Sequence, residues 1–237
     1  MTVVCGVDGC PAGWIAVSHD LAANRLWWRV VPSLEALLLD DPDGAAAPVV
    51  IALDMPIGLT EAGPRACDVE ARRKLGQPRG SSVFPAPIRP VLNAASYAAA
   101  NALRRAVEGK GMSKQAWAIV PKIMQVDATL RGSADLRFRV REVHPEVCFW
   151  AMNGERPMAW SKKRVQGRAE RADVLGRHFG AIIGQALNTK PAGCHADDLL
   201  DAFAATWTAG RIMGGKAIRL PADPPRDGHG LPMEMVY

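Results

Sequence analysis

The chain has 237 residues, of which 49% are hydrophobic and 22% are charged, a balance typical of globular proteins and not of disordered ones. Its 29 Lys and Arg residues exceed its 24 Asp and Glu residues, which gives a net charge of +5. This charge permits a polyanionic partner without requiring one. The length suits a single hydrophobic core, so one domain is expected over residues 1–237.

Several classes of protein are excluded at this stage. No uninterrupted apolar stretch is long enough to cross a bilayer, and no basic segment precedes the first apolar run, so neither a membrane protein nor a signal peptide is expected. The five cysteines include no C-x-x-C pair, which argues against a disulfide scaffold and against a structural zinc site. A cytoplasmic location is therefore expected.

The first predicted element is a hairpin over residues 3–17, in which an apolar strand ends at Asp8 before a turn rich in glycine. Burying this carboxylate is costly unless a hydrogen bond, a cation or a metal meets it. Alternatively, Asp8 caps the turn through its own backbone. A third strand is expected over residues 25–31, followed by a short helix over 33–39 and a polar turn over 40–47.

The next strand, over residues 48–53, is continuously apolar and also ends in a carboxylate, Asp54. Such a strand is typical of a parallel sheet covered on both faces. If this strand lies parallel to the first one, Asp8 and Asp54 emerge together at the carboxyl edge, where open α/β sheets place their sites.

From about residue 61 to 135 the sequence predicts an insertion with helices over 67–75, 94–107 and 114–131 and a proline-rich loop over 80–90. We expect this insertion to cap the carboxyl edge. Its candidate substrate contacts are Arg72, Ser81 and Ser82. Alternatively, the insertion only covers the sheet edge, or it forms a dimerisation surface. A homo-oligomer is therefore one of the possible states.

The later part of the chain predicts a strand over residues 138–146, with Glu142 and His144 on one face. A basic helix over 161–180 is either solvated or a phosphate-contacting ridge. Its candidate phosphate contacts are Lys162 and Lys163, with Arg164, Arg168 and Arg171 sharing one face.

The last major helix begins near His195 and carries three acids within its first turns, at Asp197, Asp198 and Asp201. One or two acids are explained by the helix dipole, but three beside small alanines exceed that requirement. A proline-rich coil and a short strand over 233–237 follow.

Acids from three elements therefore converge. The proposed ligands are Asp8, Asp54, Asp198 and Asp201, with Glu142 as a supporting carboxylate. Converging carboxylates repel one another unless cations lie between them, and Mg²⁺ and Mn²⁺ prefer such oxygen ligands. Two such ions suit phosphodiester hydrolysis.

These motifs together resemble domain-of-unknown-function family 429, whose members are regarded as predicted nucleases of the ribonuclease-H-like superfamily. The resemblance implies an α/β fold with a ribonuclease-H-like mixed sheet in the order 3-2-1-4-5, helices on both faces and metal-facing acids on the last helix. Many nucleases of that superfamily carry Glu where this chain has Asp54. The segments that carry the resemblance are residues 6–10, 53–58, 81–87, 121–123, 142–146 and 197–202.

The sequence thus favours a Mg²⁺- or Mn²⁺-dependent nuclease or phosphodiesterase that acts on nucleic acid or a smaller phosphodiester, with no membrane partner. Two alternatives remain. One is a non-catalytic binding or assembly protein on the same scaffold. The other is a nucleotide-binding protein of the sugar-kinase and actin type, although 237 residues are too few for the second lobe of that group.

Overall fold

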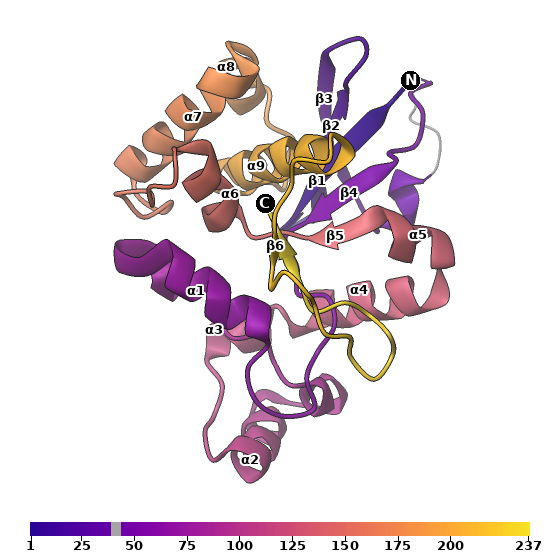
Figure 1. Cartoon of the computed structure of the whole chain (residues 1–237), viewed down its shortest axis with the longest axis vertical. Coiled ribbons are helices and arrows are strands. Elements are labelled where there is room, and N and C mark those ends of the chain that lie inside the picture. The colour runs from indigo at the N-terminus through magenta and orange to yellow at the C-terminus, as the bar shows by residue number, and fades with distance from the viewer. Residues whose placement is uncertain (39–43) are drawn as a thin grey trace.

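The computed structural model describes residues 1–38 and 44–237. A five-stranded mixed sheet with helices on both faces forms its centre, and the strand order β3-β2-β1-β4-β5 confirms the expected one (Figure 1). Strands β1, β2 and β3 pair antiparallel, whereas β4 is parallel to both β1 and β5. The sheet strands are β1 (Val3–Cys10), β2 (Gly13–Asp20), β3 (Arg25–Val31), β4 (Val50–Leu53) and β5 (Val140–Glu142), and a separate antiparallel pair is formed by β6 (Arg219–Leu220) and β7 (Met235–Val236).

Helices supply most of the remaining described chain. The α-helices are α1 (Ala66–Arg79), α2 (Tyr97–Glu108), α3 (Lys114–Ala118), α4 (Val120–Gly132), α5 (Ala134–Arg139), α6 (Pro145–Met152), α7 (Val165–Phe179), α8 (Ile182–Asn188) and α9 (Ala196–Met213). Three short 3₁₀ turns are η1 (Glu35–Leu37), η2 (Gly80–Ser82) and η3 (Arg89–Asn93). Among the described residues, no helix combines the length and apolar character needed to span a bilayer.

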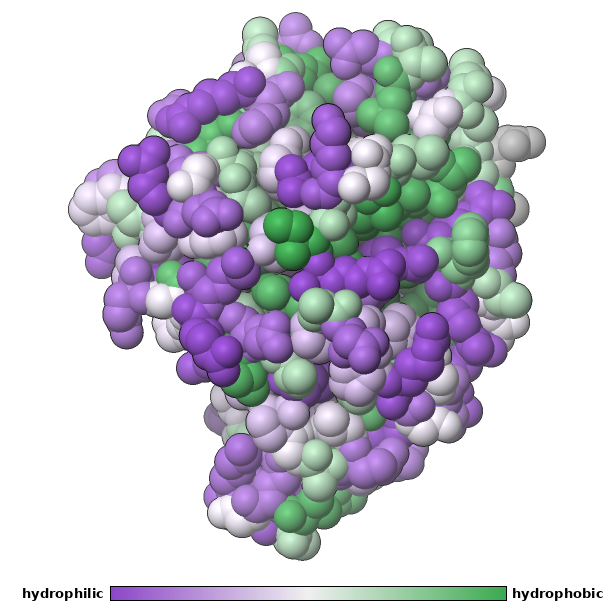
Figure 2. Space-filling model, viewed as in Figure 1, coloured by the Kyte–Doolittle hydropathy of each residue, from purple (hydrophilic) through white to green (hydrophobic). Residues whose placement is uncertain are grey.

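Each face of the sheet has its own hydrophobic core because side chains alternate along a strand. Cys5 and Val7 of β1 belong to a cluster that includes the apolar side of α4. Val4 of β1 and Ala52 of β4 belong to a second cluster, which α9 dominates. Helices α6 and α7 pack against α9 on that side (Figure 1). In the same view, hydrophilic residues cover much of the surface around α1 and α7 (Figure 2).

Helix α9 lies directly on the backbone of β1 at Gly6. A Cβ atom added to Gly6 would lie 2.1 Å from the Thr206 nitrogen and 2.2 Å from the Ala202 carbonyl oxygen. The Thr206 hydroxyl donates to the Val17 carbonyl at 2.9 Å, which ties the helix to β2 as well. A glycine at position 6 therefore sets how closely α9 approaches the sheet.

The strand expected over 138–146 is much shorter in the structure. Ser133 caps α5 by accepting a hydrogen bond from the Leu136 nitrogen at 3.2 Å, so the chain is helical up to Arg139. His144 lies beyond β5 and caps α6, whose first residue is Pro145. At both ends of the predicted strand, the chain therefore forms capped helices although its alternating pattern predicts a strand.

Two of the expected helices also differ from those in the structure. The helix expected over 114–131 is divided into α3 and α4 around Ile119, with Pro121 in the first turn of α4, a position that proline favours. The helix expected over 33–39 is a single 3₁₀ turn at η1. Leu39 and residues 40–43 of the expected polar turn lie outside the described residues.

The close approach at Gly6 leads to a first prediction. We expect Gly6→Ala to lower the free energy of unfolding by about 3 kcal/mol or more, because the added methyl group meets backbone atoms that cannot move aside independently. Chemical denaturation measures this change. Gly210→Ala in α9 is the matched control, since its Cβ would meet no atom within 4 Å, and it should be neutral or stabilising by up to about 1 kcal/mol.

Candidate functional site

Three carboxylates meet near the carboxyl ends of β1 and β4. Asp8 lies inside β1, which continues to Cys10 through its pairing with β2 and does not end at Asp8 as expected, whereas Asp54 directly follows β4. One oxygen from each of Asp8, Asp54 and Asp201 lies within 4.8 Å of the other two. Strand β1 pairs with β4 in parallel, and the Asp54 nitrogen donates to the Val7 carbonyl at 2.9 Å. The expected juxtaposition of Asp8 and Asp54 is therefore present.

The alternation of the strands explains why these side chains converge. Asp8 follows Gly6 by two residues and Asp54 follows Ala52 by two, so both are in phase with the α9 face of the sheet. Asp201 immediately precedes Ala202, whose carbonyl oxygen lies against Gly6. The contact between α9 and β1 thus brings the third carboxylate over the first two.

Burial and mutual repulsion perturb these carboxylates. The exposed fractions of Asp8 and Asp201 are 7% and 1%. Desolvation, followed by the charges of Asp54 and Asp201, raises the pKa of Asp8 well above its ordinary value. Desolvation likewise raises the pKa of Asp54 to about 7. The Gly9 nitrogen donates to Asp8 Oδ1 at 2.7 Å, within strand β1.

A lysine ammonium enters this cluster. Lys162 Nζ donates to Asp201 Oδ2, and the charge of Asp201 raises the pKa of Lys162. Lys163 Nζ forms an ion pair with Asp197 at 2.7 Å and is largely exposed. Both lysines were expected to contact phosphate, and in this structure each is paired with a carboxylate of α9.

Asp198 takes a different position from the one expected. Its Oδ2 atom accepts a hydrogen bond from the His195 nitrogen at 2.9 Å, which forms a capping box at the start of α9. Because α9 begins at Ala196, Asp198 is the third helical residue, the usual partner in such a box. Its charge contributes to the raised pKa of Asp8, but Asp201 is the third member of the cluster of three carboxylates.

Glu142 also has another partner. Its two carboxylate oxygens accept from Arg65 Nη1 and Nη2, both at 2.7 Å, and Oε2 accepts from the Ile57 nitrogen at 2.6 Å. Arg65 also pairs with Asp68 at 2.6 Å. Cys67, Asp68 and Glu142 form a second group with metal-like spacing, but the buried guanidinium of Arg65 already pairs with both carboxylates.

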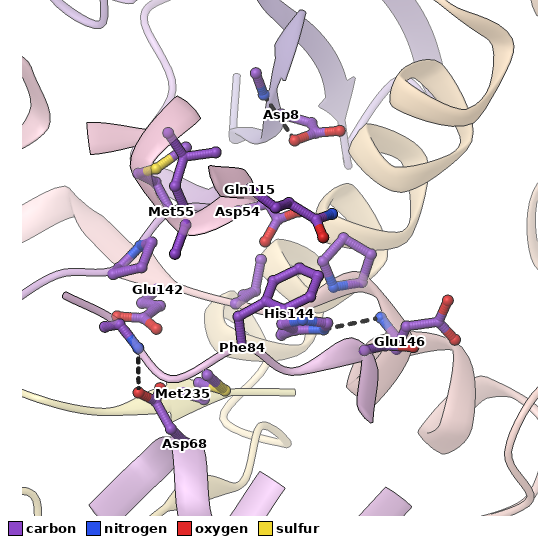
Figure 3. Close-up of a pocket in the computed structure, with 18 of the residues that line it drawn as sticks. Asp8, Asp54, Met55, Asp68, Phe84, Gln115, Glu142, His144, Glu146 and Met235 are labelled. Atoms are coloured by element: carbon purple, nitrogen blue, oxygen red, sulfur yellow. Dashed lines mark hydrogen bonds between the residues drawn. The ribbon is translucent and has the colours of Figure 1, made fainter. Parts of the chain in front are cut away.

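The carboxylate cluster borders a cleft of about 460 Å³. The ends of β1 and β4 form one part of its lining, and the segment after β5 contributes His144 and Glu146 (Figure 3). The insertion contributes the loop from Ser82 to Ala86 and the α3–α4 region. The insertion therefore lies beside the carboxylates, as the capping arrangement predicts.

The expected substrate contacts in the insertion do not share one position. Ser82 lines this cleft, whereas Ser81 and Arg72 line a separate hollow beside Gly76. Arg72 Nη1 donates to the Val83 carbonyl at 2.6 Å, so it supports the loop from behind. In α7, Arg171 is fully buried and donates to Glu146, which removes it from the expected phosphate-contacting ridge.

Sequence reasoning assigned no role to three further lining residues. Lys122 Nζ donates to the Gly13 carbonyl at 2.6 Å and lies 4.4 Å from the ring centroid of Trp14. Burial lowers the pKa of Lys122. Its place in the cleft results from the fold of α4 onto the hairpin, so no spacing in the sequence could have indicated it.

The other two residues are His144 and Glu146. The Glu146 nitrogen donates to His144 Nδ1 at 3.2 Å (Figure 3), and burial lowers the pKa of the His144 imidazole. Glu146 Oε2 is buried and has no hydrogen-bond partner among the described residues. Its charge contributes to the raised pKa of Asp54, so Glu146 is an acid close to the cluster of three carboxylates. Its position in the His-Pro-Glu segment was the available signal.

Comparison with known proteins identifies a family. A family model described as "Protein of unknown function (DUF429)" matches residues 6–226. Neither a curated protein nor a solved structure gives a significant match. The matched range includes the three clustered carboxylates and the whole of the insertion.

The buried Arg65 network leads to a second prediction. We expect Glu142→Gln to lower the free energy of unfolding by about 1–3 kcal/mol, because Asp68 still pairs with Arg65 but a buried guanidinium nitrogen now faces an amide in place of a carboxylate oxygen. Thermal and chemical denaturation measure the loss. Asp135→Asn, which removes an exposed pair with Arg139, should cost less than about 1 kcal/mol. Equal costs would assign Glu142 no special structural role.

The raised pKa of Asp54 leads to a third prediction, which applies to the protein in the presence of a metal chelator. Between the ordinary value of 3.8 and the folded value of about 7, the folded protein holds a proton that the unfolded chain releases. The free energy of unfolding should therefore fall as the pH rises across this window, by on the order of a few kcal/mol. Denaturation from pH 4 to 8 measures the slope. Asp54→Asn should make the slope shallower, with the raised pKa of Asp8 maintaining the remainder, and Asp223→Asn, at an exposed carboxyl, should leave it unchanged.

Proposed function

This chain belongs to the DUF429 family of proteins of unknown function, and we propose that it is a divalent-metal-dependent phosphodiesterase of the nuclease class. The observation that carries the proposal is the cluster of Asp8, Asp54 and Asp201, which brings oxygens from two strands and one helix within 4.8 Å of one another. Such a cluster is destabilising in itself and needs a functional reason.

The donor set suits a hard divalent cation. Asp8, Asp54 and Asp201 offer only carboxylate oxygens, the ligands that Mg²⁺ and Mn²⁺ prefer. Glu146 adds a carboxylate oxygen without a partner among the described residues. When bound, these ions supply a water of lowered pKa and positive charge for the transition state.

The reaction is the hydrolysis of a phosphate ester bond. The oxygen of water forms a new bond to phosphorus and the bond from phosphorus to the leaving oxygen breaks, which gives a phosphomonoester and an alcohol. The proton from water passes to a carboxylate of the cluster and then to solvent, and the leaving oxygen takes up a proton from water. Lys122 and Lys162, which both line the cleft, attract the anionic substrate.

One observation favours a second candidate, a non-catalytic binding protein on the same scaffold. Lys162 forms an ion pair with Asp201, so the cluster already has one internal counter-charge. In an inactive protein this lysine would permanently take the place of a metal ion. In the proposed enzyme, a divalent ion competes with this lysine and with the protons that the raised pKa values of Asp8 and Asp54 retain on the cluster.

Binding of Mn²⁺ separates these candidates and is the fourth prediction. At a hundred-fold excess of Mn²⁺ over its dissociation constant, the protein should gain about 2.7 kcal/mol in free energy of unfolding. Asp8→Asn should abolish this gain and reduce cleavage of a phosphodiester at least about 100-fold, since even outer-shell changes at metal sites cost 10- to 100-fold. Melting curves and a chromogenic phosphodiester measure both effects.

Asp198→Ala is the matched control for this experiment. It removes the capping box at α9 and should cost about 0.5–2 kcal/mol of stability, while the gain from Mn²⁺ persists. If Mn²⁺ does not stabilise the wild-type protein, the metal-dependent proposal fails and the non-catalytic candidate is preferred. If Asp198→Ala also abolishes the gain, Asp198 is a ligand and the capping role is secondary.

A further inference from the structure

The size of the cleft restricts what can reach the carboxylates. Its volume of about 460 Å³ is within the range of sites for single small molecules and cofactors, about 300–1,000 Å³. Asp8 and Asp201 are almost fully buried beside it. A cleft of this size suits one nucleotide unit and is too small to enclose a length of duplex.

The lining of the cleft has two chemical characters. One part is charged and includes Asp8 and Asp54 of the carboxylate cluster with Lys122 and Lys162. The insertion supplies a wall that combines polar side chains with apolar ones, among them Phe84, Pro85, Ala116 and Ile119. This combination matches a nucleotide, in which an anionic phosphate is joined to a flat base with apolar faces.

Phe84 is the exposed aromatic side chain of that wall. It is 41% exposed and is drawn among the lining side chains together with Gln115 (Figure 3). Its neighbours are fixed: Val83 is fully buried, and the Ala86 nitrogen donates to Asp68 Oδ2 at 2.9 Å. An exposed ring on a fixed backbone loses little freedom when a base stacks on it.

The amide of Gln115 provides a polar group on the same insertion. Gln115 is exposed and lines the cleft, and its side chain offers both donors and an acceptor. Such a group can pair with the Watson–Crick edge of a base only when that edge is free. In a duplex this edge is already paired.

We propose that the cleft binds a phosphodiester whose adjoining base is unpaired, with that base stacked on Phe84 and the phosphate directed to the carboxylate cluster. The cleavage of this substrate rests on the proposed function, whereas its binding does not. The shared chemistry occurs in single-stranded nucleic acid and in free dinucleotides. Double-stranded DNA lacks it.

Binding measurements with the full chain test this proposal in Ca²⁺, a divalent cation used here to limit cleavage. The probes are a short labelled single-stranded DNA oligonucleotide, the blunt duplex of the same sequence, and an unlabelled dinucleotide as competitor, all followed by fluorescence anisotropy. The single strand should bind at least about 10-fold more tightly than the duplex, because one stacked base alone contributes a factor of about 5 to 100.

Variants of Phe84 identify the stacking surface. Phe84→Ala should weaken binding of the single strand by about 5- to 100-fold, and Phe84→Trp should restore it, because an indole ring also stacks. Phe138→Ala is the matched control, since Phe138 is 78% exposed on α5 and does not line the cleft. It should leave binding unchanged. Melting curves of each variant establish that it is folded.

The outcomes separate this proposal from the proposed function. Binding of the single strand that depends on Phe84, without cleavage in Mn²⁺, supports this inference and contradicts the nuclease assignment. Equal binding or equal cleavage of duplex and single strand overturns this inference and leaves the metal-dependent activity intact. Absence of binding to every probe also overturns it. Competition by the dinucleotide at concentrations similar to the single strand supports a short substrate, and much weaker competition supports a nucleic acid strand.

Discussion

The contact between helix α9 and strand β1 is the constraint on which the candidate site depends. Only a residue without a side chain allows the Thr206 nitrogen and the Ala202 carbonyl to lie where they do over Gly6. The same contact fixes Asp201, one residue before Ala202, above the sheet. A larger separation would bury less apolar surface and would leave Asp8 and Asp54 without their third carboxylate.

Two groups of acids lie along the same cleft, and they differ in the positively charged side chain with which they pair. Asp68 and Glu142 share the guanidinium of Arg65, which also donates to the Ile57 and Gly58 carbonyls and so connects the insertion with β5. That network is internally satisfied, and its role is to hold the wall of the cleft. The cluster at Asp8 contains three acids and a single ammonium, and the ion pair of that ammonium is with Asp201.

The family resemblance implied the sheet order, and short-range patterns in the sequence predicted the meeting of Asp8 with Asp54. Apolar strands that end in a carboxylate are recognisable locally, and parallel pairing brings such ends together. The choice among the acids of α9 was beyond this reasoning. Asp198 and Asp201 are both acids at helical spacing, and only the position where α9 begins makes Asp198 a cap.

The sequence by itself therefore determined the first four strands and the carboxylates near the carboxyl ends of two of them, since these follow from hydrophobic periodicity and turn residues. Only the tertiary structure decided the partners of the charged side chains. Glu142 meets Arg65 across 77 positions of the chain, and Lys122 reaches the Gly13 carbonyl across 109. Such pairs carry no local pattern, because their energy is realised only after distant elements have packed and excluded water.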